Sequence, residues 1–379
     1  MTPAAEGPAR KAASRESAPE AQQEAIDPDA GIRFRQLDDA FRRARETAPE
    51  AIGVEHYTIG GRSVRFRVVG RDLAAAVDRP LEHLRAVESF TEPPALTVDL
   101  WDESATGVGC VGCVAEEDLN QPGDFAVSPE GRFVVTERAQ TGTVFDRREQ
   151  RLVGWIGDAG DLTLYELGRP LHTELLQWHR DHGLLAVHAG LVARRGDGVL
   201  FGGPGGSGKS TVALTCLLAG FDYLADDYVG VDGGAREGYL GHSLYCSTHL
   251  EPEHLSRFPP LRPHAIPGSL PREDKSLILL SDAFGDRLAR RARVRAIALP
   301  RVVDSEHTDL HPASTVEALK QLAPSSLMLL PYAGVGKTAF ERLSSMVERL
   351  PTFWLELGRD LDQIPHRVGE ILEKVGEAT

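Results

Sequence analysis

The sequence predicts an α/β protein in two parts, with a separate α+β domain over residues 31–165 and an α/β domain around a phosphate-binding loop over residues 166–379. Three observations lead to this prediction. A complete phosphate-loop pattern lies near the middle of the chain. Strand patterns dominate residues 124–165, and strand and helix patterns mix after residue 166. Residues 1–30 are rich in Ala, Glu, Pro, Gln and Ser without apolar periodicity, which predicts a disordered tail.

The N-terminal domain begins with a helix pattern over residues 32–45, where Phe34, Leu37 and Phe41 share one face. Two strand patterns on either side of Gly60 and Gly61 then predict a β-hairpin. A helix is expected over 73–87, with a proline interrupting it or starting its second half. Further strands are expected at residues 96–100, 124–128, 132–136, 143–146 and 151–156.

The second domain opens with a helix expected over residues 171–180, followed by strand patterns on both sides of His188. An amphipathic helix is expected directly after the phosphate loop, stopped by Gly220. The remaining pattern predicts strands at 198–201, 223–225, 228–231, 276–280 and 294–299, and helices at 314–322, 337–348 and 361–374.

The most informative motif is a glycine-rich loop that satisfies the phosphate-binding pattern G-x-x-x-x-G-K-[ST] in full. A strand pattern precedes it and a helix pattern follows it, so backbone N–H groups and a helix dipole would face an anion. We expect Lys209 to reach the β- and γ-phosphates of a nucleotide, and Ser210 to ligate Mg²⁺. The expected nucleotide-binding residues are Gly203, Gly205, Gly206, Ser207, Gly208, Lys209, Ser210 and Thr211.

A second string, G-V-G-K-T at residues 334–338, looks like a rival to this loop. It fails the pattern because Pro331 stands where the first glycine is required. We interpret it as a turn that leads into a helix.

Two adjacent acids, Asp226 and Asp227, follow the apolar strand pattern at residues 223–225. One carboxylate can hold Mg²⁺ while the other orients or deprotonates an incoming hydroxyl. The alternative is a solvated turn, but the apolar segment before the acids favours a buried strand. His188 lies on the strand expected to pair with that of the loop, and by itself it is more ordinarily a hydrogen-bonded core histidine.

Composition excludes several classes of function. The net charge of −14 gives no basic footprint for nucleic acid or an anionic membrane. No apolar run approaches the roughly 18 residues that cross a bilayer, and no signal-peptide core is evident, so we expect a cytoplasmic protein. Cys110 and Cys113 form a C-x-x-C pair without the second pair that zinc needs, which leaves two buried thiols or a redox pair.

The chain resembles the catalytic core of the HPr kinase/phosphorylase family, and of related bacterial serine kinases that include peptide-tailoring enzymes, at three segments. These are His188-Ala-Gly-Leu-Val, Gly203-x-x-Gly-x-Gly-Lys-Ser and Gly220-Phe-Asp-Tyr-Leu-Ala-Asp226-Asp227. The resemblance implies a P-loop kinase core of the PEP-carboxykinase-like type. It also implies ATP and Mg²⁺ as cofactors, and a protein or peptide partner whose serine accepts the phosphoryl group.

Carried over by residue, the resemblance implies that Asp226 is the general base, that Asp227 supports the metal, and that His188 acts with Lys209 in catalysis. It also makes a homo-oligomer an expectation. The chain departs from the family at Gly205, where a serine is usual, and at residue 211, where a glutamate is usual. HPr itself is therefore not implied as the acceptor.

Three functions remain open from the sequence. The first is a kinase of a protein or peptide serine, with the N-terminal domain recognising the polypeptide. The second is a kinase of a small hydroxylated metabolite. The third is a non-catalytic ATP-binding regulatory module, which would not need the paired acids. A GTPase is disfavoured because the chain has no N-K-x-D motif.

Overall fold

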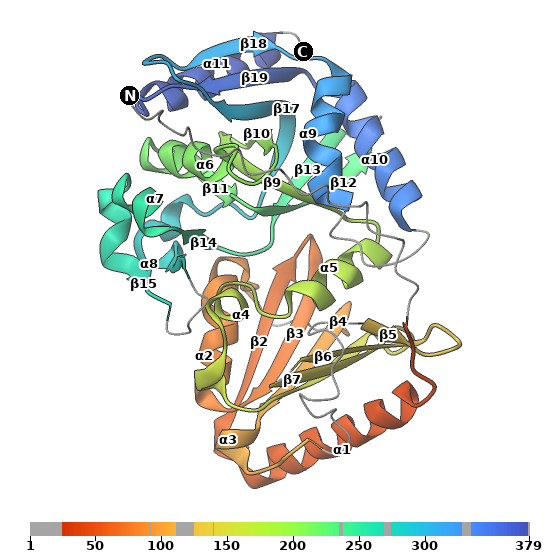
Figure 1. Cartoon of the computed structure of the whole chain (residues 1–379). Helices are drawn as coiled ribbons and strands as arrows, with labels where there is room; N and C mark the ends of the chain where they lie inside the picture. The colour runs from red at the N-terminus through yellow and green to blue at the C-terminus, as the bar shows by residue number, and fades with distance from the viewer. Residues whose placement is uncertain are drawn as a thin grey trace, which may run out of the picture.

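The computed structural model describes residues 25–88, 90, 92–110, 125–138, 140–234, 238–268, 274–327 and 335–377. These residues form a mixed α/β fold with two large sheets, one from residues 25–156 and one from residues 185–357, and a small third sheet. Figure 1 shows the first large sheet in the lower half and the second in the upper half, with helices α4 and α5 between them.

The first sheet contains the predicted hairpin, since β2 and β3 pair antiparallel around Gly60 and Gly61. Both glycines have positive φ, at 56° and 78°, which suits a residue without a Cβ. Parallel pairing then joins β3 to β4 and β4 to β8. In order across the sheet, the strands are β1 (Ala25–Ile26), β5 (Phe125–Val127), β6 (Phe133–Arg138), β7 (Thr141–Asp146), β8 (Arg151–Ile156), β4 (Leu96–Asp102), β3 (Arg62–Val69) and β2 (Ile52–Ile59).

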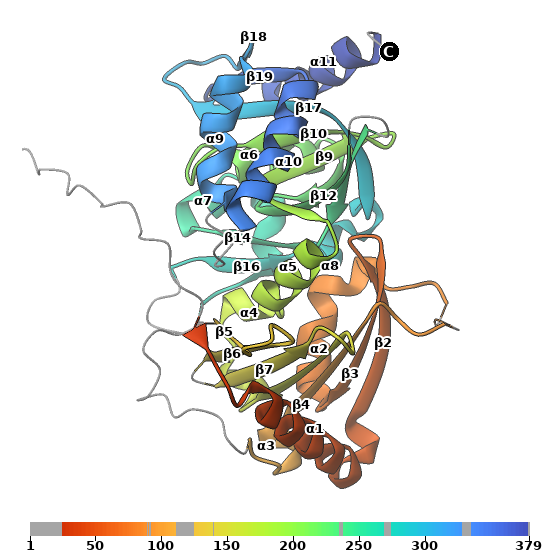
Figure 2. The ribbon, with the colours of Figure 1, turned by 90° about the vertical axis from the view of Figure 1, so that its right-hand side faces the viewer.

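Helix α1 (Ala30–Thr47) lies below this sheet in Figure 2, and the predicted apolar side chains Leu37 and Phe41 pack in one core with Trp101. Residues 25–30 are structured, although composition assigns them to the tail. Because β1 pairs with β5, the disordered tail predicted for residues 1–30 is wrong for residues 25–30, while residues 1–24 lie outside the described residues. A strand of two residues is too short to show an alternating pattern in the sequence, and its partner strand lies far along the chain.

The helix predicted over residues 73–87, with a proline interrupting it or starting its second half, is two shorter ones, α2 (Arg71–Asp78) and a 3₁₀ helix (Arg79–Leu84). Pro80 lies in the first turn of the second, where its missing N–H needs no partner. Other short elements of the first part are α3 (Glu103–Thr106) and 3₁₀ turns at Pro49–Ala51 and Ala159–Asp161.

Strand β9 (Leu185–Arg194) pairs with three other strands of the second sheet, β10, β11 and β12. Strand β10 also pairs with β17, so the strands β10, β9, β12, β13 and β17 form a closed series of pairings. Since β10, β17 and β19 run parallel, their carboxyl ends share one edge, where α/β proteins bind ligands. The other strands of this sheet are β10 (Asp197–Gly202), β11 (Asp222–Ala225), β12 (Tyr228–Gly234), β13 (Gly238–Ser243), β17 (Arg291–Val302), β18 (Asp309–Pro312) and β19 (Thr352–Leu357).

Helices cover both faces of the second sheet. Side chains of α6 (Lys209–Leu218) and α11 (Gln363–Glu377) form one core, and those of α9 (Thr315–Leu327) and α10 (Val335–Arg349) form the other. Helix α6 is not the amphipathic helix that the sequence predicts, because nearly every residue on it is buried. Helix α11 packs against it, and His254 of α7 (Pro252–Ser256) lies 2.8 Å from its Thr211, so it has no broad solvent face.

The two large sheets share one hydrophobic core. Leu175 and Trp178 of α5 (His172–Asp181) pack in it with Phe66 of the first sheet and with Tyr245, which follows β13. The small third sheet and its helices flank the same region. They are β14 (Ser247–Leu250), β15 (Ala265–Ile266), β16 (Ser276–Leu279), α4 (Leu164–Gly168), α7 (Pro252–Ser256), α8 (Ser281–Phe284), and the 3₁₀ turns Pro259–His264 and Gly285–Arg287.

The structure tests the interpretation of the G-V-G-K-T string but not that of the C-x-x-C pair. The rival string leads into α10 as expected, and Lys337 is exposed there and pairs with Glu341 at 4.0 Å. Cys113 lies outside the described residues, so the interpretation of the C-x-x-C pair stays a prediction. None of the described helices is long and apolar enough to span a membrane.

Three buried histidines predict a pH-dependent stability. Burial lowers the pKa of His83, His172 and His179 to about 3. An unfolded histidine has a pKa of about 6.5, so the unfolded chain binds protons first as the pH falls. Above about pH 6.5 these histidines do not lower the free energy of unfolding. Below that pH, each of them lowers it by about 1.4 kcal/mol per pH unit. Calorimetry should therefore show the melting temperature falling steeply between about pH 6.5 and pH 5.

His179→Leu is the variant that isolates this effect. Both ring nitrogens of His179 lack a hydrogen-bond partner among the described residues, so the substitution removes a titrating group without breaking a hydrogen bond of that side chain. The melting temperature of the variant should fall less steeply with pH than that of the wild type. Equal slopes in the two proteins would show that protonation of His179 does not contribute to the loss of stability at acid pH.

Candidate active site

The phosphate loop joins the carboxyl end of β10 to the first turn of α6, as the sequence predicts. Gly206 and Gly208 have φ values of 78° and 106°, in the left-handed region that favours glycine. A Cβ on Gly208 would lie 2.4 Å from Leu357 Cδ1, so only glycine fits there. Ser207 Oγ is buried without a hydrogen-bond partner among the described residues, and a phosphate oxygen is the kind of group that would supply one.

Lys209 lies across its own loop. Its Nζ donates to the carbonyl oxygens of Gly203 at 2.8 Å and Pro204 at 3.1 Å, and the residue is only 6% exposed. Burial lowers the pKa of Lys209, while Asp227 and Asp226 act in the opposite direction. A phosphate would offer this ammonium group a full negative charge in place of two carbonyl dipoles.

Asp226 is the more buried acid of the pair, with 4% of its surface exposed. Its Oδ1 accepts a hydrogen bond from the Tyr223 hydroxyl at 2.9 Å, and its Oδ2 accepts one from the Thr248 hydroxyl at 2.6 Å. Each carboxylate oxygen keeps a second lone pair, so a substrate hydroxyl could still donate to either.

Asp227 is held between two donors. Its Oδ1 lies 2.6 Å from Nε2 of His188, and its Oδ2 lies 2.6 Å from Nη2 of Arg169. Burial raises the pKa of Asp227, but the His188 hydrogen bond and the charges of Arg169 and Lys209 outweigh it and hold the pKa well below its usual range. Asp227 is therefore ionised, as a metal ligand or an orienting group must be.

His188 lies within the continuous strand β9, opposite Tyr228 of β12, and its ring stacks on the Tyr228 ring with centroids 5.4 Å apart. The structure thus brings together the phosphate loop, Lys209, both acids and His188, which the sequence singled out. Their roles in catalysis stay predictions.

Arg169 is the residue of this cluster that the sequence analysis missed. It follows α4, is 7% exposed, and lies over the rings of Tyr165 and Tyr228 at 5.3 and 5.0 Å. Thr248 and His249 of β14 were missed as well, although His249 Nδ1 lies 3.4 Å from Arg169 Nη2. A lone arginine in a turn carries no local signal, and these contacts arise only from the packing of distant segments.

The two remaining residues of the loop motif, Thr211 and Ser210, differ in their contacts. Thr211 is 7% exposed and its hydroxyl lies 2.8 Å from Nε2 of His254 on α7, so its side chain is already engaged by the protein. Ser210 is half-buried in the first turn of α6. Its hydroxyl remains the loop's candidate ligand for a metal.

Magnesium fits the oxygen donors of this site. Among the described residues, no group of three His, Cys, Asp or Glu side chains is placed to hold a metal by itself. Magnesium bound with a nucleotide needs only one or two carboxylates, since phosphate oxygens and water complete its shell. The Ser210 hydroxyl and the Asp227 carboxylate are hard oxygen donors of that kind.

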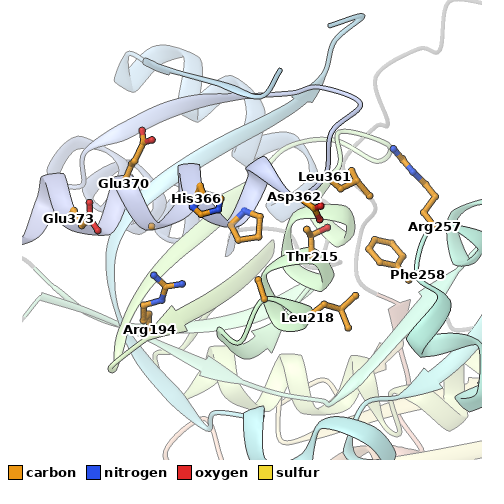
Figure 3. Close-up of a pocket in the computed structure, with 13 residues that line it drawn as sticks. Arg194, Thr215, Leu218, Arg257, Phe258, Leu361, Asp362, His366, Glu370 and Glu373 are labelled. Carbon is orange, nitrogen blue, oxygen red and sulfur yellow. The ribbon is translucent and has the colours of Figure 1, made fainter. Parts of the chain in front are cut away.

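A cavity of about 580 Å³ lies along α6 and α11, beside Arg257 and Phe258, which follow α7 (Figure 3). Its lining includes Thr215, Arg257 and His366, and neither the loop residues 203–208 nor the two acids line it. The cavity is therefore separate from the cluster described above.

Comparison with known proteins adds little. No family model and no curated protein matches the chain. Among solved structures, the HPr(Ser) kinase/phosphatase from Coxiella burnetii aligns with 51% of this chain and 97% of its own, at 11% identity and a TM-score of 0.27. A TM-score this low does not establish a shared fold.

Lys209→Ala should weaken nucleotide binding strongly. Loss of a buried cation that pairs with phosphate costs about 2–5 kcal/mol, so the dissociation constant for a fluorescent ATP analogue should rise by about 30-fold or more. Fluorescence titration measures this directly.

Lys337→Ala is the matched control, because Lys337 belongs to the rival G-V-G-K-T string and is 85% exposed in its side chain. It should bind the analogue as the wild type does. Tight binding to Lys209→Ala, or an equal loss in both variants, would contradict the assignment of the loop.

Proposed function

We propose that the protein is an ATP- and Mg²⁺-dependent phosphotransferase that moves the γ-phosphoryl group to a serine hydroxyl of a protein or peptide. The observation that carries this proposal is the pairing of β9 with both β10, which leads into the loop of Lys209, and β11, which ends just before Asp226 and Asp227. The loop and the acids therefore lie at the same end of neighbouring strands. A phosphate cradle beside two acids is what phosphoryl transfer requires, since catalysis there is mostly positioning and charge stabilisation. A module that only binds a nucleotide would not need the two acids.

The phosphate loop would hold the nucleotide. Backbone N–H groups of residues 205–208 and the N-terminus of α6 would face the phosphates, and Lys209 would move from its carbonyl partners to them. Magnesium, held by Ser210 and Asp227, would neutralise charge on the phosphates. This is the arrangement of a P-loop kinase core, which we propose for the second sheet and its helices.

Asp226 is our candidate for the general base. It is buried from water, and its two oxygens are oriented by the hydroxyls of Tyr223 and Thr248. A base must have a fixed direction and a free lone pair toward the acceptor hydroxyl, and both conditions are compatible with these contacts. Asp227, whose pKa is held low, suits the metal better.

A polypeptide acceptor is supported by the first sheet. This sheet shares a hydrophobic core with the domain that carries the loop, so an acceptor bound to the one would be presented to the other. A kinase of a small metabolite would use the same cluster with a different acceptor. Serine-containing peptides and small alcohols should therefore be compared in one assay.

Asp226→Asn and Asp227→Asn should separate the two carboxylate roles. With γ-labelled ATP and candidate acceptors, Asp226→Asn should lose transfer by about 100-fold or more at any Mg²⁺ concentration, because a general base contributes about 10²–10⁴-fold. Asp227→Asn should instead need a higher Mg²⁺ concentration for half-maximal transfer. Both variants should still bind ATP.

Asp222→Asn, at the start of the same strand β11, is the control and should transfer at the wild-type rate. Full activity in Asp226→Asn would rule out its role as the base. The reverse pattern, in which Asp227→Asn is dead at saturating Mg²⁺ and Asp226→Asn is active, would exchange the two roles. Absence of transfer by the wild type to every acceptor class would reject the proposed function.

A further inference from the structure

We propose that Arg169 is a positioning residue, which fixes the carboxylate of Asp227 against His188 and so aligns the site for transfer. The proposal rests on the proposed function for its effect on catalysis. Its structural content, the orientation of Asp227, can be tested without any activity.

Arg169 reaches Asp227 from the segment between the two large sheets, where it follows α4 and precedes α5. Its Nη2 donates to Asp227 Oδ2 at 2.6 Å, on the side of the carboxylate opposite His188. A carboxylate with one donor can turn about its Cβ–Cγ bond, whereas one donor on each oxygen fixes its plane. Arg169 thus determines which way Asp227 faces.

The guanidinium of Arg169 is itself held firmly. It lies over the rings of Tyr165 and Tyr228, and Nδ1 of His249 lies 3.4 Å from its Nη2. Tyr228 also stacks on the His188 ring, so one aromatic side chain supports both donors of Asp227. A planar cation in contact with two aromatic rings is a rigid support, and a lysine ammonium would lack this planar contact.

The first sheet helps to fix the segment that carries Arg169. Helix α4 begins with a capping box between Thr163 and Glu166, and Glu166 lies 3.9 Å from Arg138 of β6. Arg138 also donates to Thr173 of α5, at 3.2 Å. The turn with Arg169 lies between these two anchored helices, so the first sheet contributes to the geometry of the site.

Arg132 provides a matched control. It also pairs with a buried acid, Asp146, and lies 4.7 Å over the Phe133 ring, but it does so within the first sheet and away from the loop. Replacing either arginine removes an arginine–carboxylate pair and the ring contacts of that arginine, two for Arg169 and one for Arg132. Only the replacement of Arg169 should change the site.

The first experiment is a pair of crystal structures, of Arg169→Met and Arg132→Met. In Arg169→Met, the carboxylate of Asp227 should turn away from His188, breaking the hydrogen bond from Nε2. In Arg132→Met, the bond should remain. An unchanged Asp227 in Arg169→Met would overturn the proposal, whether or not the protein proves to be a kinase.

The second experiment is kinetic. In Arg169→Met, kcat should fall by about 100-fold, the loss expected when a catalytic group is displaced by about 1 Å. KM for ATP should change by less than about threefold, because Arg169 contacts an acid and not the phosphate loop. Added guanidinium should restore part of the rate to Arg169→Ala, but none to Arg132→Ala.

Arg169→Lys covers the case in which the methionine variant fails to fold. It keeps a cation near Asp227 without the planar stacking, so its kcat should lie between those of the wild type and Arg169→Ala. Wild-type kcat in Arg169→Lys and Arg169→Ala would contradict a positioning role. A rise in KM for ATP that matches the fall in kcat/KM, with no rescue, would contradict it as well.

Discussion

The candidate site depends on the balance of charge around Asp227. A carboxylate this close to a second acid is stable in a partly buried place only where cations and donors compensate it. His188, Arg169 and Lys209 provide that compensation, and together they hold the pKa of Asp227 low. This compensation keeps the carboxylate ionised in its partly buried position.

The fold brings these groups together through β9. This strand pairs with β10, which leads into the phosphate loop, with β11, which ends at the acids, and with β12, which carries Tyr228. His188 lies on β9 itself. Because one strand aligns all three neighbours, an error in its register would separate the loop from the acids. Arg169 enters from the segment between the two sheets, so the complete cluster needs both.

The sequence could predict what depends on neighbouring residues. The loop, with Lys209 and Ser210, is a contiguous pattern with fixed geometry, and the paired acids follow an apolar strand. It could not predict Arg169 or Thr248, which meet the acids only through long-range packing. It also misjudged α6, because an amphipathic pattern shows one apolar face but not whether other helices cover the remaining surface. The same limit applies to β1, whose partner strand lies far along the chain.

A crystal structure with Mg²⁺ and a non-hydrolysable ATP analogue tests the central claim most directly. Lys209 Nζ should leave the carbonyl oxygens of Gly203 and Pro204 and contact the β- and γ-phosphates, with the metal between those phosphates and Ser210. A nucleotide bound instead in the cavity beside Arg257 and His366, with Lys209 still on its loop, would contradict the account.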